Sequence, residues 1–323
     1  MAQRRLVILA LLLCVLAGLL PPSVQAASTT EALEPISPNQ KCVLTLNYRH
    51  GDTNFEGIPV KVYRIAEVSA DFQYTLTSAF AESGVILNGV QSSSEWNVIR
   101  STLESYIVGN RITPTLAEST DQAGQVHFYS VSTGMYLVAA AETVTEAGTY
   151  IFNSTLIALP SLGADGRWQY QVSASPKPDL LPPIGPDEKE EFRVIKLWKG
   201  DEGKNSRPAS VTVEIFRNGV SYETVTLSAT NLWTYSWTAD KDHADWSVVE
   251  RNVPAGYRAT VDDRTTTFLV TNTWKPDDSD DIIDPPKTGD TSNVLLYVLL
   301  MFLSGSLLVI LGMAEKRRAY EKS

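Results

Sequence analysis

The sequence predicts a mainly β protein with two tandem, immunoglobulin-like β-sandwich domains, an N-terminal signal peptide and one C-terminal transmembrane helix. Short β-branched and aromatic runs bounded by turn residues recur through residues 40–175 and again through 191–275. The proline-rich stretch 176–190 separates these two groups and is typical of a linker. The length of 323 residues also suits about two domains.

Residues 1–26 have the three parts of a secretory signal peptide. Arg4 and Arg5 supply the charged start, an uncharged apolar run follows, and small residues precede the expected cleavage position. Removal of this segment takes away Cys14 and leaves Cys42 as the only cysteine. The secreted chain therefore cannot form an intramolecular disulfide, although its compartment would allow one.

The first domain, residues 40–175, combines strands with one predicted helix. Its strand runs include CVLTLNY, PVKVYRIAEV, QVHFYSV, GMYLVAAA and TYIFNSTLIALP. Between Glu95 and Val108 apolar residues recur at helical spacing, and Ser92 or Ser94 can cap the N-terminus. The apolar stripe consists of Trp96, Ile99, Leu103 and Ile107. We expect a β-sandwich with a helical insertion.

The second domain, residues 191–275, has strand patterns throughout and no competing helical period. Asn218-Gly219 lies between the extended runs VTVEIF and VSYETVTL, which is a strong signal for a tight β-hairpin. The aromatic and β-branched runs NLWTYSWTA, DWSVVE and TTFLVTNTW follow. Regular short strands separated by turns predict a small β-sandwich.

Three polar residues of the second domain stand among apolar ones. Lys196, Glu250 and Asn272 each have apolar residues two positions away, so strand alternation places each of them on an apolar face. Val194 and Trp198 flank Lys196, Val270 and Trp274 flank Asn272, and Trp246 and Val248 precede Glu250 on the same strand face. A lone buried lysine is costly, so the three groups should either meet or point outward. A partly exposed lysine beside an ordinary asparagine remains the alternative, because both faces of the first strand are apolar.

The C-terminus carries three features in a fixed order. The pentapeptide Pro285-Pro286-Lys287-Thr288-Gly289 follows the acidic spacer 276–284. An uncharged apolar run, 294–313, comes next and is long enough to span a bilayer as a helix. The basic tail after it is expected to stay cytoplasmic. A lone membrane anchor would need only the last two features.

This order resembles the LPxTG-type sorting signal that sortases process in Gram-positive surface proteins, and it would span residues 285–323. The resemblance implies that a sortase cuts between Thr288 and Gly289. The Thr288 carbonyl would then be joined to an amine of the peptidoglycan precursor or of another subunit. Pro285 stands where the family has leucine, which leaves the sortase class open. Pro286 favours an extended backbone, which suits a peptide presented to a transpeptidase.

The second domain resembles the Cna protein B-type domain of Gram-positive adhesins and pilins. The run VIKLW, the pair Arg207-Pro208 and the runs VTVEIFRNG, NLWTYSW, VVERNVPAGY and VTNTW carry this resemblance, in that order. It implies an intramolecular isopeptide bond between Lys196 and Asn272, assisted by Glu250. Burial suits this chemistry, because it favours a neutral amine and a protonated carboxyl group.

Residues 40–175 resemble, more loosely, the N-terminal domain of Gram-positive pilins. The family's shaft subunits end this domain with a motif whose lysine receives the threonine of the next subunit. Trp168, Val172, Pro176 and Lys177 match that motif, whereas Ser175 stands where an aromatic residue is expected. Lys177 is therefore either the acceptor lysine or an ordinary linker lysine.

The remaining reactive side chains define no site. Lys41, Lys61 and Asn153 have the right types for a second isopeptide bond in the first domain, but their spacing selects no pair. The 3 histidines lack metal-ligand spacing, and no motif of a nucleophilic enzyme is present. We expect no enzymatic activity, no cofactor and no metal. The 37 acidic residues against 27 basic ones argue against nucleic acid as a partner.

These features predict a secreted protein that is linked covalently to the cell wall of a Gram-positive bacterium. Its contact with the membrane would be limited to the C-terminal helix before processing. The leading function is that of a pilus subunit, shaft or base, or of an adhesin. Its partners would be a sortase, the peptidoglycan precursor, other pilin subunits and a host surface ligand. Residues 275–288 span only about 45 Å when extended, which mildly favours polymerisation. The alternative is a monomeric adhesin for a host protein or glycan.

Overall fold

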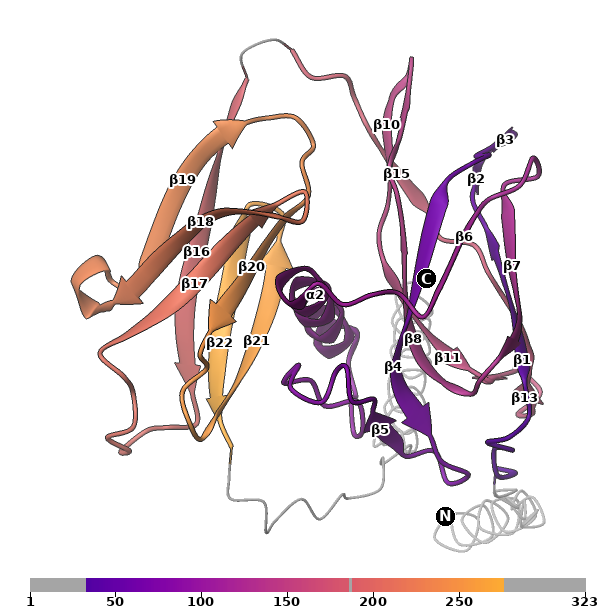
Figure 1. The fold of residues 1–323 in the computed structure, drawn as a ribbon, viewed down its shortest axis with the longest axis horizontal. Coiled ribbons are helices and arrows are strands. Elements are labelled where there is room, and N and C mark those ends of the chain that lie inside the picture. Colours follow the sequence, from indigo (N-terminus) through magenta and orange to yellow (C-terminus); the bar gives the residue numbers. More distant parts are fainter. Residues whose placement is uncertain (1–32, 186–187, 276–323) are drawn as a thin grey trace, which may run out of the picture. The chain divides into compact units, whose positions relative to one another are not determined.

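The computed structural model describes residues 33–185 and 188–275, and its described part is mainly β, as predicted (Figure 1). The predicted signal peptide (1–26), spacer (276–284) and sorting signal (285–323) lie outside the described residues. Within those residues no helix has both the length and the apolar character needed to cross a membrane. The described chain divides into two compact units.

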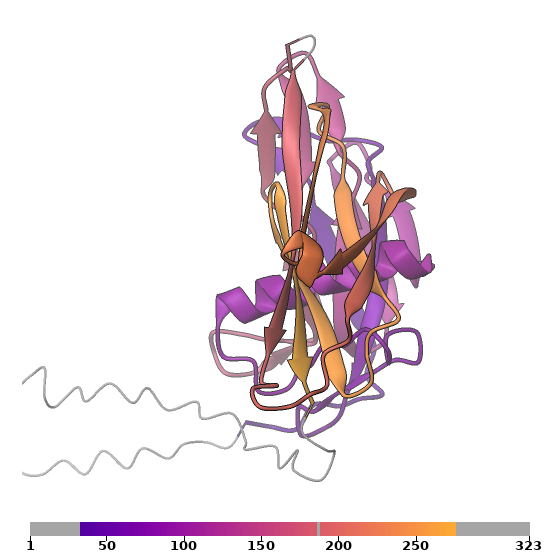
Figure 2. The same ribbon diagram turned by 90° about the vertical axis from the view of Figure 1, so that its left-hand side faces the viewer.

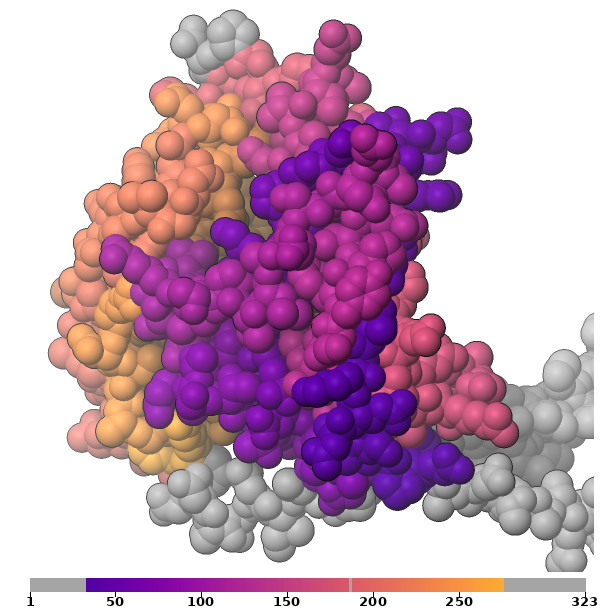
Figure 3. All heavy atoms as spheres, turned by 45° about the vertical axis from the view of Figure 1, so that its right-hand side comes forward, coloured from indigo at the N-terminus to yellow at the C-terminus, as the bar shows by residue number. Residues whose placement is uncertain are grey.

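Unit 1 is assembled from three separate stretches of sequence, 33–75, 116–143 and 151–179. Side chains of these stretches adjoin one another in Figure 3, in indigo, magenta and rose. One sheet has the order β14-β1-β7, in which β1 runs parallel to β14 and antiparallel to β7. Its strands are β1 (Cys42–Asn47), β7 (Gln125–Val131) and β14 (Gln171–Ala174).

A second sheet has the order β11-β8-β4-β5, and β6 also pairs with β4. Its strands are β4 (Pro59–Val68), β5 (Tyr74–Leu76), β6 (Leu116–Ser119), β8 (Gly134–Ala140) and β11 (Thr155–Leu159). The inward faces of the strands supply a buried apolar core. This core includes Leu44, Leu46, Val60, Val62, Ile65, Phe128, Leu137 and Val138.

Residues 33–185 also contain several short strands. Two of them pair as β2 with β3, and two as β12 with β13. A three-stranded sheet has the order β15-β10-β9. These strands are β2 (Arg49–His50), β3 (Thr53–Asn54), β9 (Thr143–Thr145), β10 (Gly148–Phe152), β12 (Ser161–Leu162), β13 (Trp168–Gln169) and β15 (Pro178–Leu181).

Unit 2 contains two sheets built from the second predicted domain. One sheet has the order β19-β16-β22-β21 and the other β18-β17-β20. Their strands are β16 (Lys189–Lys199), β17 (Ser210–Arg217), β18 (Val220–Ser228), β19 (Thr234–Asp240), β20 (Trp246–Arg251), β21 (Tyr257–Arg264) and β22 (Thr267–Trp274). A 3-10 turn, η1 (Ala229–Asn231), follows β18.

The predicted hairpin at Asn218-Gly219 is confirmed, since β17 and β18 pair across it. Both turn residues have positive φ angles, 52° and 74°, as the twist of a two-residue hairpin requires. The core of unit 2 is apolar and aromatic. It includes Phe192, Val194, Val213, Ile215, Leu227, Trp237, Trp246, Val248, Phe268 and Val270.

The predicted helix is confirmed as α2 (Ser93–Asn110), and Ser92 caps its N-terminus in a capping box with Glu95. The predicted stripe is buried at Ile99, Leu103 and Ile107. Although α2 lies in sequence within residues 40–175, it belongs to unit 2 and packs against β20 and β21. Figure 2 shows α2 running across the strands of this unit.

The Thr102 hydroxyl holds α2 to the edge of β21. It accepts a hydrogen bond from the Val261 N–H at 2.9 Å and lies 3.2 Å from the Val261 carbonyl oxygen. We expect Thr102→Val to lower the free energy of unfolding by about 1–3 kcal/mol, because it keeps the shape but leaves a buried N–H without its acceptor. Urea unfolding measures this loss. An unchanged midpoint would contradict it, and Thr224→Val on the exposed face of β18 is the matched control.

Candidate functional site

Two neighbouring strands bring Lys196 and Asn272 to the same interior face. Strands β16 and β22 are parallel neighbours (Figure 1). Their register places Lys196 opposite Val270 and Trp198 opposite Asn272. The buried positions alternate along both strands, so the even-numbered side chains point into the core. Lys196 and Asn272 are therefore close neighbours inside the sandwich, although 76 positions separate them in the sequence.

Glu250 reaches the same place from the opposite sheet. It lies on β20, where Trp246 and Val248 share its inward face, and it pairs across the strand with Val213. Three strands from two sheets thus contribute one polar group each to an apolar core. We call Lys196, Glu250 and Asn272 the Lys–Glu–Asn cluster.

The members of this cluster contact one another directly. The Lys196 Nζ lies 3.4 Å from Glu250 Oε2, and Asn272 Nδ2 donates a hydrogen bond to Glu250 Oε1 at 2.8 Å. The lysine and glutamate side chains are 0% and 1% exposed, and Asn272 is 0% exposed. Lys196 Nζ also donates to the Leu197 and Val270 carbonyl oxygens, at 3.0 and 3.3 Å. The alternative of a partly exposed lysine is therefore wrong.

Burial is the largest influence on both ionisable groups. It lowers the pKa of Lys196 to about 8, which the nearby Glu250 carboxylate partly opposes. It raises the pKa of Glu250, which Lys196 partly opposes. Both shifts favour a neutral amine facing a protonated carboxyl group.

Two oxygen atoms of the cluster, Glu250 Oε2 and Asn272 Oδ1, are buried and accept no hydrogen bond from the described residues, and Oε2 has only its 3.4 Å ion-pair contact with Lys196. A half-turn of the Asn272 amide exchanges its nitrogen and oxygen. In that orientation a protonated Glu250 donates to the Asn272 carbonyl oxygen, which satisfies the oxygen and polarises the carbonyl carbon. The cluster can therefore hold an amine nucleophile beside an activated amide.

Aromatic rings form the wall around the amine. The Lys196 Nζ lies 4.3 Å from the centre of the Trp198 ring. The Trp198 ring in turn packs edge-on against Trp233 and Tyr257, with ring centres 5.4 and 5.0 Å apart. The Lys196 side chain is 0% exposed beneath this wall, and this burial is the physical reason for its lowered pKa.

The partners of Trp198 lead to a second polar group that the sequence pattern did not indicate. Asp201 is only 2% exposed, and it is bound by Arg207 and Tyr257. Asp201 and Arg207 lie in the loop that joins β16 to β17, where no periodicity applies. The one signal in the sequence is Arg207 itself, a charged residue directly before a proline in that loop.

The lysine of the pilin-like motif lies on the surface. Lys177 is exposed and follows β14, while Val172 is buried and pairs with Leu44 of β1. The Trp168 indole N–H donates to the Glu34 carbonyl oxygen at 2.7 Å, and its ring packs 4.7 Å from that of Phe72. The motif thus presents Lys177 to solvent in the short connection between β14 and β15.

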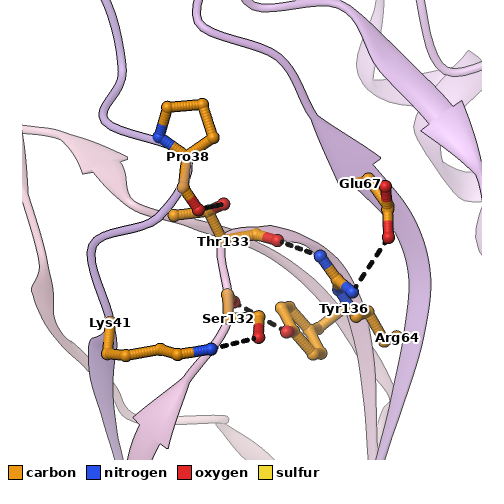
Figure 4. A network of polar contacts seen from close by, with 7 residues as sticks. All are labelled: Pro38, Lys41, Arg64, Glu67, Ser132, Thr133 and Tyr136. Carbon is orange, nitrogen blue, oxygen red and sulfur yellow. Dashed lines mark hydrogen bonds and ion pairs between the residues drawn. The ribbon is translucent and has the colours of Figure 1, made fainter.

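The other candidate lysines of unit 1 have separate surroundings. Lys41 Nζ donates to Ser132 Oγ at 2.9 Å, beside the network in which Arg64 and Tyr136 bind the turn before β8 (Figure 4). Lys61 is exposed on β4. Asn153 Nδ2 donates to Asp179 Oδ2 at 2.7 Å in an exposed position. These residues form no buried cluster comparable to that of unit 2.

The remaining predictions concern the sorting pentapeptide and the absence of a metal site. The sorting pentapeptide, with Thr288 and Gly289, lies outside the described residues. In residues 33–185 and 188–275, no group of three or more histidine, cysteine, aspartate or glutamate side chains is arranged to hold a metal ion.

Comparison with known proteins identifies part of the chain. Residues 192–273 match the family model of the Cna protein B-type domain, and this range contains the whole Lys–Glu–Asn cluster. The chain therefore carries a Cna B-type domain. No curated protein matches the chain.

Several solved structures are similar at low identity. The shaft pilin SpaA of Lactobacillus rhamnosus GG is 12% identical, with 73% of this chain and 99% of that chain covered and a TM-score of 0.26. Two B repeat units of the collagen binding protein CNA of Staphylococcus aureus are 12% identical, covering 73% and 50%, with a TM-score of 0.25. The fimbrial protein FimP of Actinomyces oris is 14% identical, covering 67% and 52%, with a TM-score of 0.28. These scores are too low to carry an argument, so the identification rests on the domain match.

Proposed function

We propose that this chain is a structural surface protein of a Gram-positive bacterium, a pilus subunit or a wall-anchored adhesin. In this proposal its Cna B-type domain locks itself with an isopeptide bond between Lys196 and Asn272. The observation that carries the proposal is the buried Lys–Glu–Asn cluster. Three polar groups of the types required for this chemistry meet in a core that is otherwise apolar, and a merely structural role would be served better by apolar side chains.

The reaction balances without any further reagent. The neutral Lys196 amine attacks the Asn272 amide carbon while Glu250 donates a proton to the carbonyl oxygen and later transfers protons to the leaving group. One bond forms, between Lys196 Nζ and Asn272 Cγ, and one breaks, between Asn272 Cγ and Nδ2. Ammonia leaves. Each chain reacts once with itself, so this is maturation of the protein and not enzymatic turnover.

The bond would brace residues 27–288, whose sequence holds Cys42 as its only cysteine and so allows no intramolecular disulfide. It closes a loop of about 76 residues, and by the chain-entropy account of cross-links this stabilises the folded domain by about 4–5 kcal/mol. Unlike a disulfide, an amide cannot be reduced. Cys42 is 0% exposed, and burial raises the pKa of its thiol to about 11, so it is poorly suited to replace such a bond.

The intact mass of the chain tests the bond. We expect residues 27–288 to be lighter than their sequence by one ammonia. Glu250→Gln is expected to restore the full mass, because a glutamine cannot transfer the protons. Glu223→Gln is the matched control, since Glu223 accepts a hydrogen bond from Tyr235 in the same unit but lies outside the cluster. A full mass in the parent chain would refute the bond.

Anchoring to the wall is proposed from the C-terminal sequence. A sortase would release the helix 294–313 by cutting after Thr288 and would transfer the Thr288 carbonyl to an amine acceptor. That acceptor is either the peptidoglycan precursor or a lysine of another subunit. Exposed Lys177, between β14 and β15, is the acceptor that we propose for polymerisation.

Replacing Lys177 tests the role of the chain as a shaft subunit. We expect surface extracts of the parent strain to contain a ladder of covalent multimers that resists SDS. Lys177→Ala should abolish this ladder, because the acceptor amine is lost. Lys61→Ala, which removes another exposed lysine of unit 1, should leave it intact. A ladder that survives Lys177→Ala would contradict the assignment of the acceptor.

One observation favours a second function. Ser175 stands where pilin motifs have an aromatic residue, which weakens the case for polymerisation. A monomeric wall-anchored adhesin would carry the same anchor and the same braced domain, and it would bind a host protein or glycan directly. Extracts that contain only wall-linked monomer, together with binding of the purified chain to host material, would select this function.

A further inference from the structure

The loop between β16 and β17 contains a buried carboxylate that is fully bound by its neighbours. Arg207 donates two hydrogen bonds to Asp201, from Nε to Oδ2 at 2.6 Å and from Nη2 to Oδ1 at 2.7 Å. The Tyr257 hydroxyl donates a third, to Oδ2 at 2.7 Å. Ser206 Oγ lies 2.9 Å from the Tyr257 hydroxyl oxygen and donates to it, since the only proton of that phenol is already used.

This arrangement differs from an ordinary surface ion pair. The Asp201 side chain is 0% exposed, whereas the Arg207 side chain is 47% exposed and closes over it from the solvent side. The hydrogen bonds from Arg207 hold the pKa of Asp201 well below its usual range, so the carboxylate stays ionised while buried. A buried charge is retained only when its partners are complete, as they are here. We call Asp201, Arg207 and Tyr257 the loop clip.

The loop clip adjoins the wall of the Lys–Glu–Asn cluster. The Arg207 guanidinium carbon lies 5.7 Å from the centre of the Trp198 ring, and the Tyr257 ring packs edge-on against Trp198 at 5.0 Å. The Lys196 amine lies 4.3 Å from that same Trp198 ring. Trp198 therefore stands between the loop clip and the amine, and the clip fixes it from two sides.

We propose that the loop clip seals this end of the sandwich, holds Trp198 over Lys196, and thereby keeps water from the amine during isopeptide formation. Asp201, Arg207 and Tyr257 are positioning residues, since none of them touches the reacting atoms. This inference rests on the proposed function of the cluster. It assigns a role to residues that the bond-forming chemistry does not itself need.

The charges of the loop clip favour a sealing role over an electrostatic one. Asp201 alone would raise the pKa of Lys196, and Arg207 alone would lower it. Because the two charges are tightly paired, their effects on the amine largely oppose each other. Burial remains the largest influence on the lysine, and the clip acts by maintaining that burial.

Arg207→Lys separates sealing from charge. Lysine keeps the positive charge but lacks the planar fork that binds both oxygens of Asp201. A purely electrostatic role predicts little change, whereas the sealing role predicts that water reaches Trp198 and Lys196. Arg264→Lys is the matched control, because Arg264 also pairs with an aspartate, Asp262, but its side chain is 64% exposed.

The first measurement uses a chain that cannot react. In residues 27–288 carrying Asn272→Ala, the Lys196 amine stays free, and NMR of its side chain against pH reports its protonation. We expect Arg207→Lys to lower the fraction of neutral amine at pH 7 by about tenfold, as water returns. Arg264→Lys should leave the pH profile unchanged. An unchanged profile with Arg207→Lys would overturn the proposal.

The second measurement follows the reaction. Chains with Asn272 intact are collected unreacted in denaturant directly after synthesis, refolded, and sampled over time by intact mass. We expect Arg207→Lys and Asp201→Asn to lose ammonia about tenfold more slowly than the parent, and Arg264→Lys to match it. Parent rates in both clip variants would overturn the proposal.

A third variant, Tyr257→Phe, covers the case in which the other clip variants fail to fold. It removes one hydrogen bond of the clip while keeping the ring against Trp198, so it tests sealing by itself. It should give a smaller slowing in the same direction, and a parent rate would count against the clip. If the parent chain itself loses no ammonia, the proposed function fails, whereas the pH profile of the unreactive chain still decides the role of the clip.

Discussion

Lys196→Met is expected to lower the free energy of unfolding of residues 191–275 by about 4–5 kcal/mol, because it removes the cross-link while filling the same space. Tryptophan fluorescence during urea unfolding measures this loss, since Trp237 and Trp246 lie in the core of this segment. Lys189→Met is the matched control. Lys189 lies on the same strand but its side chain is 59% exposed, and its replacement should change stability by less than about 0.5 kcal/mol.

A double variant distinguishes the two states of the domain. Lys196→Met alone also leaves Glu250 buried without its ion-pair partner, which is destabilising whether or not the bond forms. If Lys196 and Asn272 were not joined, Lys196→Met with Glu250→Leu would replace the whole ionisable pair by apolar side chains, which is neutral or stabilising by about 1–4 kcal/mol. A double variant as stable as the parent would therefore contradict the isopeptide bond, whereas a loss of about 4–5 kcal/mol would support it.

Glu250→Ala should be more damaging than Lys196→Met. It removes the assisting carboxyl group, so the bond does not form, and it leaves Lys196 buried without its charged partner. The second effect costs about 3–5 kcal/mol on top of the lost cross-link. In Lys196→Met the remaining Glu250 escapes most of this cost, because its raised pKa lets it become neutral by protonation and it keeps its hydrogen bond from Asn272. Glu250→Ala should therefore unfold at a lower urea concentration than Lys196→Met, and the reverse order would argue against the proposed role of Glu250.

Thr288→Ala is expected to abolish covalent attachment to the wall. The Thr288 carbonyl is the group that a sortase would transfer, and without its recognition the predicted transmembrane helix 294–313 would keep the precursor in the membrane. Digestion of the wall with a muramidase, followed by immunoblotting, measures the wall-linked fraction in a host with the matching sortase. We expect this fraction to fall to background while membrane-held precursor accumulates.

Lys287→Gln provides the control for that experiment, because the sorting pattern accepts any residue at this position. It should leave the wall-linked fraction at the parent level. If Thr288→Ala also left the fraction unchanged, the pentapeptide would not be the sorting motif, and the C-terminal helix would act as a simple membrane anchor.

Local elements could be predicted because each depends on neighbouring residues. The hairpin at Asn218-Gly219 follows from the positive φ angles that these two residues tolerate. The helix α2 follows from its spacing of apolar residues and from the capping box of Ser92 and Glu95. The packing of α2 on β20 and β21 could not be predicted, because the spacing of its apolar residues does not show which strands they contact.

The sequence by itself determined the mainly β character and which residues face the core. Alternation alone put Lys196, Glu250 and Asn272 on apolar faces, but it left open whether they meet. Only the tertiary structure decided this, because the parallel pairing of β16 with β22 and the stacking of a second sheet are contacts between residues far apart in the chain. For the same reason the sequence offered only Arg207 as a signal of the loop clip and did not show its partners. Asp201 and Tyr257 are 56 positions apart, and only folding brings that carboxylate to its donors and makes its burial tolerable.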